Sequence, residues 1–235
     1  MKLAASLLNK IISNIMFNKF YKNDYKFRKD LKDFANKNWF GKILKPLFKG
    51  PYDFINRYLP YPRDFLLKKI PKNGVCCEIG AYEGVFSERI EKICKPQKLY
   101  LIDPWTGLKD RTEEKYDQKH QDRRYNIVMD KFRNEISDGK VVIIRQTSDQ
   151  AASKFKDEFF DFVYIDGDHS YQQVKKDLNN YYPKVKRGGF LGGDDYPIES
   201  VKLAVEEFAK GKSIVPQLKN QQFIFRKTDY IDSKL

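Results

Sequence analysis

The stretch FVYIDGDHSYQQVKKDLNNYYPKVKRGGFLGGDDYP, residues 162–197, contains two apolar runs that each end in acidic residues. Asp166 and Asp168 follow the first run, and Asp194 and Asp195 follow the second. If the runs are neighbouring parallel strands, about 4.8 Å apart, their carboxyl ends share one edge of a sheet. Four carboxylates at that range raise one another's pKa or bind a cation, and oxygen ligands suit magnesium, manganese or calcium. The stretch therefore predicts a parallel sheet that carries a site for a hard divalent ion.

Apolar runs alternate with amphipathic segments on both sides of this stretch, as in an α/β domain. Ser170 and Gln173 have the spacing of a capping box at the start of a helix. The pattern predicts a Rossmann-like, mostly parallel sheet with helices on both faces and a C-terminal antiparallel strand pair. The expected strands are residues 75–80, 98–103, 141–145, 160–166 and 188–193, with a terminal pair at 213–218 and 221–227. We expect four helices: one after Gly84, one over residues 125–136, one that begins near Ser170 and one that begins near Val201.

The 235-residue chain has a net charge of +13, and much of it lies near the N-terminus. Residues 1–50 hold 12 Lys or Arg against three Asp, a net charge of +9. Glycine and proline interrupt the chain at residues 50–74, so we expect a basic helical appendage at residues 1–59 and an α/β domain at residues 60–235. The basic segment can be a solvated appendage, or it can contact nucleic acid, an acidic partner or the surface of an anionic membrane.

The N-terminal region does not have the pattern of a membrane-spanning helix. Residues 3–20 place apolar side chains on one helical face, which suits an interfacial helix or a helix that docks on a core. Polar residues interrupt the run too often for a membrane span or a secretory signal. Three cysteines, two of them adjacent at Cys76 and Cys77, do not form a disulfide framework. We therefore expect a cytoplasmic protein, with peripheral membrane contact by residues 1–50 as an option.

The first turn between strand and helix is EIGAYEG, residues 78–84. Its glycines allow a tight turn and close approach of a ligand to the start of the helix. It lacks the middle glycine of a dinucleotide fingerprint, and Glu83 would repel a pyrophosphate. S-adenosylmethionine carries positive charge and no phosphate, so the acidic residues suit it better. Asp103 follows Gly80 by 23 residues, close to the spacing at which an acid binds ribose hydroxyls.

In the order and spacing of these motifs the chain resembles class I S-adenosylmethionine-dependent methyltransferases, in particular the metal-dependent sugar and macrocin-type O-methyltransferases. The resemblance covers residues 60–227 and rests on five segments in order: EIGAYEG, KLYLIDPW, VVIIRQTSDQAA, YIDGDHSY and KVKRGGFLGGDDY. It implies that residues 60–235 are a class I methyltransferase domain. It implies a metal bound by Asp166, Asp194 and Asp195, and Asp168 as general base. His169 departs from the pattern and leaves open which of the two accepts the proton. The cofactor-binding residues that it implies are Glu78, Gly80, Ala81, Tyr82, Gly84, Asp103, Ser148 (beside the adenine) and Asp166.

The resulting expectation is an S-adenosylmethionine-dependent O-methyltransferase, assisted by Mg²⁺ or another hard divalent cation. Its substrate would be a hydroxylated small molecule or a glycan precursor. Two alternatives stay open: an RNA methyltransferase or nucleic-acid-binding protein that uses the basic segment, and a metal-dependent glycosyltransferase that uses Asp166 and Asp168. Trp105 either stacks on the adenine or packs in the core. The sequence leaves the methyl acceptor and the oligomeric state undetermined.

Overall fold

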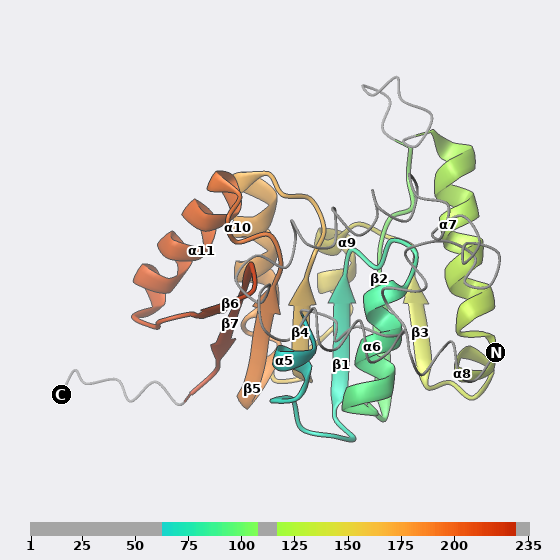
Figure 1. Ribbon diagram of the computed structural model, residues 1–235, viewed down its shortest axis with the longest axis horizontal. Helices are drawn as coiled ribbons and strands as arrows, with labels where there is room; N and C mark the ends of the chain where they lie inside the picture. Colours follow the sequence, from blue (N-terminus) through green and yellow to red (C-terminus); the bar gives the residue numbers. More distant parts are fainter. Residues whose placement is uncertain (1–62, 108–116, 229–235) are drawn as a thin grey trace, which may run out of the picture. The chain divides into compact units, whose positions relative to one another are not determined.

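The computed structural model describes residues 63–107 and 117–228, which form an α/β domain around one twisted sheet (Figure 1). Within these residues the sheet has seven strands in the order β3-β2-β1-β4-β5-β7-β6. The strands are β1 Val75–Ile79, β2 Lys98–Ile102, β3 Val141–Ile144, β4 Phe160–Ile165, β5 Val185–Gly193, β6 Gln217–Lys219 and β7 Gln222–Arg226.

Strands β1 to β5 are parallel, whereas β7 pairs antiparallel with β5 and β6 pairs antiparallel with β7. The expected fold class, including the C-terminal antiparallel strand pair, is confirmed. The strand order reverses direction at β1 and β4, which is where open α/β sheets bind ligands beyond their carboxyl ends. The loops after β1 and β4 therefore frame the candidate site.

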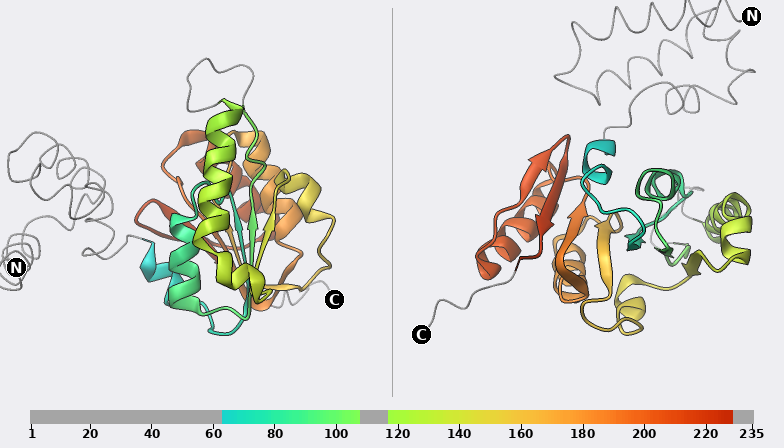
Figure 2. Two further views of the ribbon diagram at one scale, coloured as in Figure 1. Left: turned by 90° about the vertical axis from the view of Figure 1, so that its right-hand side faces the viewer. Right: turned by 90° about the horizontal axis from the view of Figure 1, so that it is seen from below.

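Helices cover both faces of the sheet (Figure 2). One layer contains α5 and α6, which contact each other, with α7 and α8 beyond them, and the other contains α9, α10 and α11. This two-layer cover is the arrangement that a parallel sheet needs, because both of its faces are apolar. The helices are α5 Asp64–Leu67, α6 Val85–Cys94, α7 Gln118–Lys131, α8 Arg133–Ser137, α9 Ser148–Ala152, α10 Tyr171–Tyr181 and α11 Glu199–Lys212.

Alternation along β1 sends side chains to both layers. Cys77 and Ile79 belong to the apolar core beneath α10 and α11, whereas Glu78 accepts a hydrogen bond from Ser87 of α6. All three cysteines are buried and free. The inner strands are thus buried on both faces, and Glu78 is a buried carboxyl on the α6 side, with 1% of its surface exposed.

The structure corrects several details of the sequence analysis. The single helix expected at residues 125–136 is two helices, because the backbone leaves helical geometry at Phe132 (φ −108°, ψ 23°). The short helices α5 and α9 were not expected, and β5 begins at Val185 rather than at residue 188. Lys186 and Arg187, before the glycine pair, are polar and not buried, so this part of the strand lacks the apolar pattern.

The appendage expected at residues 1–59, and the nucleic-acid or membrane contacts expected of residues 1–50, lie outside the described residues. They stay predictions. In residues 63–107 and 117–228, no helix combines the length and the hydropathy that crossing a bilayer requires.

Candidate active site

The turn after β1 brings two backbone segments into close contact. Gly80 has φ +86°, and a Cβ atom there would lie 2.0 Å from the carbonyl oxygen of Asp166. The Gly80 N–H donates to the Ile102 carbonyl at 2.8 Å, and the Asp166 N–H donates to the Ile79 carbonyl at 2.8 Å. These bonds hold the carboxyl ends of β1, β2 and β4 together. Glycine is needed here both for its backbone angle and for the missing side chain.

The next residues form a compact turn that leads into α6. The Gly84 N–H donates to the Ala81 carbonyl at 2.7 Å, and Gly84 precedes the helix with φ +70°. Tyr82, which is about half exposed, has φ +51° and lies under the Arg124 guanidinium, 4.3 Å from the ring centre. The predicted cofactor residues Gly80 to Gly84 are thus one continuous turn at the carboxyl edge.

Asp103, the predicted ribose ligand, is fixed by this turn. Its carboxylate accepts the Tyr82 N–H at 2.9 Å and the Trp105 N–H at 2.8 Å. Burial raises the pKa of Asp103 above its ordinary value, and these two hydrogen bonds oppose that change. Trp105 is buried: its indole N–H donates to the Tyr82 carbonyl at 2.8 Å, and its ring packs edge-on against Tyr125 at 5.2 Å. In this structure Trp105 packs and supports the turn.

Glu78 lies below the same turn on the α6 side. Burial raises the pKa of its carboxyl to about 8, and the hydrogen bond from Ser87 opposes that rise. An uncompensated buried carboxyl is costly, so a cationic ligand above the turn would stabilise its ionised form.

The acidic residues after β4 and β5 meet at the same edge. Asp166, His169 and Asp195 each offer one ligand atom, and these atoms all lie within 4.8 Å of one another. His169 Nε2 is 3.0 Å from Asp195 Oδ2 and 3.8 Å from Asp166 Oδ1. The carboxylates of Asp166 and then Asp195 raise the pKa of His169, against the opposing effect of burial. Burial also raises the pKa of Asp195.

Asp194, predicted as a metal ligand, faces a different partner. Its carboxylate forms an ion pair with Arg63, and the same guanidinium donates to Asp166 Oδ2 at 2.6 Å. Burial raises the pKa of Asp194 to about 6, and the positive charge of Arg63 opposes that rise. The sequence analysis did not single out Arg63. It lies in no motif and outside every predicted helix and strand, so no local signal could have identified it.

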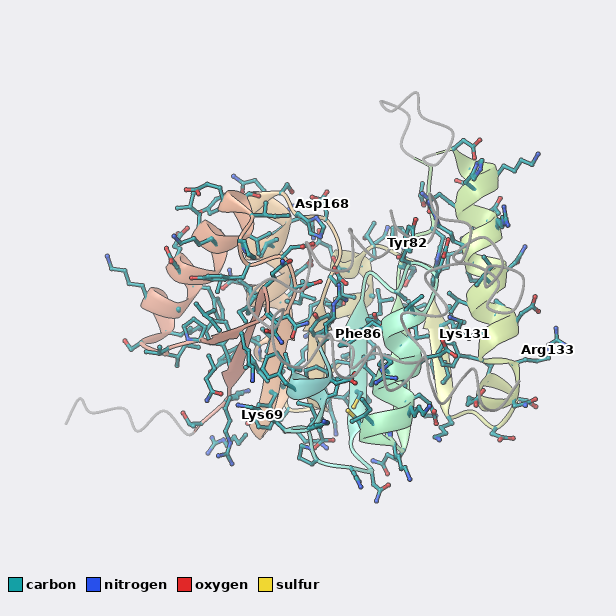
Figure 3. All side chains as sticks on the ribbon, in the orientation of Figure 1. Lys69, Tyr82, Phe86, Lys131, Arg133 and Asp168 are labelled. Atoms are coloured by element: carbon teal, nitrogen blue, oxygen red, sulfur yellow. The ribbon has the colours of Figure 1, made fainter. Side chains whose placement is uncertain are left out.

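Asp168 lies on the exposed side of the loop after β4. Figure 3 shows it at the same edge of the sheet as Tyr82. Its Oδ1 accepts the Ser170 N–H at 2.7 Å, and Ser170 in turn caps α10 by accepting the Gln173 N–H. The Gln173 side chain turns inward to Ser148 and Asp177, so only half of the predicted capping box forms. A complete capping box, Thr147 with Gln150, opens α9 instead.

Ser148 is buried, and its contacts lie on the α10 side. Gln173 donates to its hydroxyl at 3.1 Å, and the Tyr181 hydroxyl donates to its carbonyl at 2.8 Å. The predicted position of Ser148 beside the adenine stays a prediction. Asp177 next to it is buried, and this raises its pKa to about 6.

The two glycines before Asp194 have a steric role. A Cβ at Gly193 would lie 2.5 Å from Phe223 Cζ and 2.7 Å from the Ile165 carbonyl oxygen. Because β5 runs between β4 and β7, a larger residue would push Asp194 and Asp195 away from Asp166. The small residues thus allow the aspartates that follow β4 and β5 to lie close together.

The strand order, the glycine turn after β1 and the acid that follows β2 together define the Rossmann-like fold of class I S-adenosylmethionine-dependent methyltransferases. A family model described as a methyltransferase domain matches residues 77–196, slightly more than half of the chain. The chain belongs to this methyltransferase family. The matched range contains the turn after β1, Asp103 and all four aspartates of the carboxyl edge.

Solved structures show the same fold. A Staphylococcus aureus protein provisionally assigned as a caffeoyl-CoA O-methyltransferase aligns with a TM-score of 0.54 and 15% identity, over 85% of this chain and 98% of that one. A Corynebacterium glutamicum protein aligns with a TM-score of 0.52 and 13% identity, over 96% of this chain and 97% of that one. The O-methyltransferase NovP aligns with a TM-score of 0.51 and 22% identity, over 75% of this chain and 78% of that one.

Among curated proteins, an uncharacterized protein of Acanthamoeba polyphaga mimivirus is 53% identical over 36 residues. That match spans 15% of this chain and 16% of the viral protein's length.

Proposed function

We propose that this protein is an S-adenosylmethionine-dependent O-methyltransferase, assisted by a divalent metal ion, that acts on a hydroxylated small molecule or a glycan precursor. The observation that carries the proposal is the convergence of Asp166, His169 and Asp195 at the sheet edge, next to the glycine turn after β1. Methyl transfer to oxygen requires a hydroxyl to lose its proton beside the methyl donor. Acidic and imidazole groups at that edge suit this chemistry.

The residues around the turn fit S-adenosylmethionine. Gly80 lets the turn after β1 lie directly against the Asp166 backbone, where a Cβ would clash with the Asp166 carbonyl oxygen. Asp103 is fixed by two backbone N–H groups and keeps acceptor capacity for ribose hydroxyls. Glu78 supplies a buried carboxyl whose ionised form gains from a nearby positive charge. Ala81 and Tyr82 would line the same turn.

The acidic edge fits a divalent cation. Asp166 and Asp195 offer carboxylate oxygens, and two residues compete for the third position. His169 already has its ring nitrogen beside them, whereas Asp194, the ligand expected from the sequence, is paired with Arg63. Magnesium and manganese both accept such carboxylates, and an imidazole shifts the preference towards manganese and other transition metals.

A mechanism follows from the residues of this chain. When bound, S-adenosylmethionine would supply the methyl group and the cation would lower the pKa of a substrate hydroxyl. Asp168 is exposed at the edge and would accept the hydroxyl proton, because the His169 nitrogen is engaged with Asp195. The turn at Gly80 and the acidic edge would hold the two reactants in attack geometry. No covalent intermediate with the protein is needed.

Isothermal titration tests the cofactor assignment. We expect the wild-type chain to bind S-adenosylmethionine and the Glu78→Ala and Asp103→Ala variants to bind it at least about tenfold more weakly, since each loses a charged contact. An absence of binding, or equal binding by both variants, would remove the assignment.

A methyl-transfer screen over sugars, catechols and RNA, with and without Mg²⁺ or Mn²⁺, tests the acceptor and the metal. Transfer to a hydroxyl that chelators suppress supports the proposal. Preferential, salt-sensitive transfer to RNA would favour the nucleic-acid alternative. Membership in a methyltransferase family leaves the glycosyltransferase alternative without support.

A further inference from the structure

Arg63 brings a positive group to the acidic edge from the α5 side. Its guanidinium contacts Asp166 Oδ2 at 2.6 Å through one nitrogen and Asp194 Oδ2 through the other. The Arg63 and Asp166 side chains are 18% and 19% exposed, and that of Asp194 is 10% exposed. A guanidinium between two largely desolvated carboxylates is a strong, directional contact, because its planar fork holds each partner in a fixed place.

Packing and a second ion pair fix the position of Arg63. Its guanidinium carbon lies 5.1 Å from the ring centre of Phe86 on α6 and 5.7 Å from that of Tyr164 on β4, within cation–π range (Figure 3 labels Phe86). The adjacent Asp64 accepts from Arg89 of α6, with Arg89 Nε 3.0 Å from Asp64 Oδ1. The short helix α5 is therefore anchored beside Arg63.

The contacts divide the acidic edge into two parts. One oxygen of Asp166 faces Arg63, and the other, Oδ1, is the oxygen nearest His169. Asp194 belongs to the arginine side, whereas Asp195 lies beside His169. One carboxylate, Asp166, is shared by both sides. The third ligand of the proposed cation therefore depends on Asp194: if Asp194 remains paired with Arg63, His169 is the residue left to bind the ion.

We propose that Arg63 is a positioning residue that keeps Asp194 on the arginine side, so that a divalent cation is bound by Asp166, His169 and Asp195. This inference rests on the proposed function, because it concerns the cation of that same site. It replaces an all-carboxylate site by a mixed oxygen and nitrogen site, which favours first-row transition-metal ions, with Mn²⁺ as the EPR-active probe, over Mg²⁺ or Ca²⁺. It also places one fixed positive charge next to the ion.

Manganese binding to the full-length chain tests the proposal, with the metal alone as probe. Titration calorimetry would give the Kd, and pulsed EPR would detect nitrogen coupled to bound Mn²⁺. We expect one Mn²⁺ site with a nitrogen signal in the wild type. His169→Ala should abolish the nitrogen signal, and both His169→Ala and Asp195→Asn should raise the Kd at least about tenfold.

A charge-neutral double variant separates the two possible roles of Asp194. Arg63→Gln alone should lower the Kd several-fold, because it removes a positive charge that contacts Asp166, one of the ligands of the proposed doubly charged ion. Arg63→Gln combined with Asp194→Asn removes both charges, so we expect a Kd within about threefold of wild type and an unchanged nitrogen signal. Arg63→Lys should restore most of the wild-type affinity, since it keeps the charge.

Arg133→Gln is the matched control, since it removes one positive charge from an exposed pair with Asp130, away from the acidic edge (Figure 3). Its Mn²⁺ affinity should equal that of the wild type. A double variant that binds Mn²⁺ as weakly as Asp195→Asn would make Asp194 a ligand and overturn the inference. So would a wild-type chain with no nitrogen signal, or with no Mn²⁺ binding. Titration of S-adenosylmethionine, run in parallel, shows separately whether the methyltransferase proposal itself fails.

Discussion

Substitution of Gly80 by alanine should damage both stability and cofactor binding. The new Cβ would lie 2.0 Å from the Asp166 carbonyl oxygen, 2.5 Å from its carbonyl carbon and 2.8 Å from Gly167 Cα. Ordinary contacts begin at 3.4 Å, so the loop after β4 must move by about 1.4 Å. All three contacts are backbone atoms, which cannot rotate away as the end of a side chain can.

The cost has three parts. A side chain at φ +86° costs about 1–2 kcal/mol. Overpacking against backbone adds about 1–3 kcal/mol. A displacement of this size also breaks the Asp166 N–H to Ile79 bond, now 2.8 Å long, at about 1 kcal/mol. We therefore expect Gly80→Ala to lower the free energy of unfolding by about 3–6 kcal/mol and to weaken S-adenosylmethionine binding at least about tenfold.

Urea denaturation and isothermal titration measure these effects, and two other glycines provide controls. Gly139 has φ +68°, and no atom lies within 4 Å of the place that a Cβ would take, so Gly139→Ala isolates the backbone cost of about 1–2 kcal/mol. Gly211 in α11 also has open space, and Gly211→Ala should stabilise the helix by up to about 1 kcal/mol. If Gly80→Ala is no less stable than Gly139→Ala, the turn after β1 does not pack as closely against the loop after β4 as the structure shows.

Three further predictions concern residues around the site. In the folded chain the pKa of Asp177 is about 6, above its ordinary value of 3.8, so its contribution to stability is present below pH 3.8 and is lost as the pH rises through 6. Asp177→Asn should therefore flatten the pH dependence of the unfolding free energy between about pH 4 and 6, and an unchanged slope would contradict this. Trp105→Phe removes the bond to the Tyr82 carbonyl and should weaken S-adenosylmethionine binding several-fold in calorimetry, with little change if the turn does not depend on it. Thr147→Ala removes the N-cap of α9 and should cost about 1 kcal/mol in urea denaturation, whereas Thr147→Ser should be nearly neutral.

The order of strands and helices and the fold class were predictable from the sequence, because hydrophobic period and chain connectivity are local properties. The glycine turn at Gly80 and the acidic ends of β4 and β5 were also visible as motifs. Parallel strands place their carboxyl ends at one edge of the sheet, so the topology alone brings the glycine turn and the acidic residues together. What was wrong in detail, such as the break at Phe132 and the half-formed capping box at Ser170, depends on partners outside each segment.

Only the tertiary structure decided how the edge is divided. Arg63 reaches Asp166 across 103 residues of sequence and Asp194 across 131, and nothing in its neighbours along the chain signals these contacts. The same holds for Ser148, whose hydroxyl meets Gln173 of another helix. The sequence determines which acidic residues follow the strands, because the hydrophobic period and the order of residues along the chain locate the ends of the strands. Which cation or side chain each acid faces is a matter of distances between remote segments, and packing sets those distances.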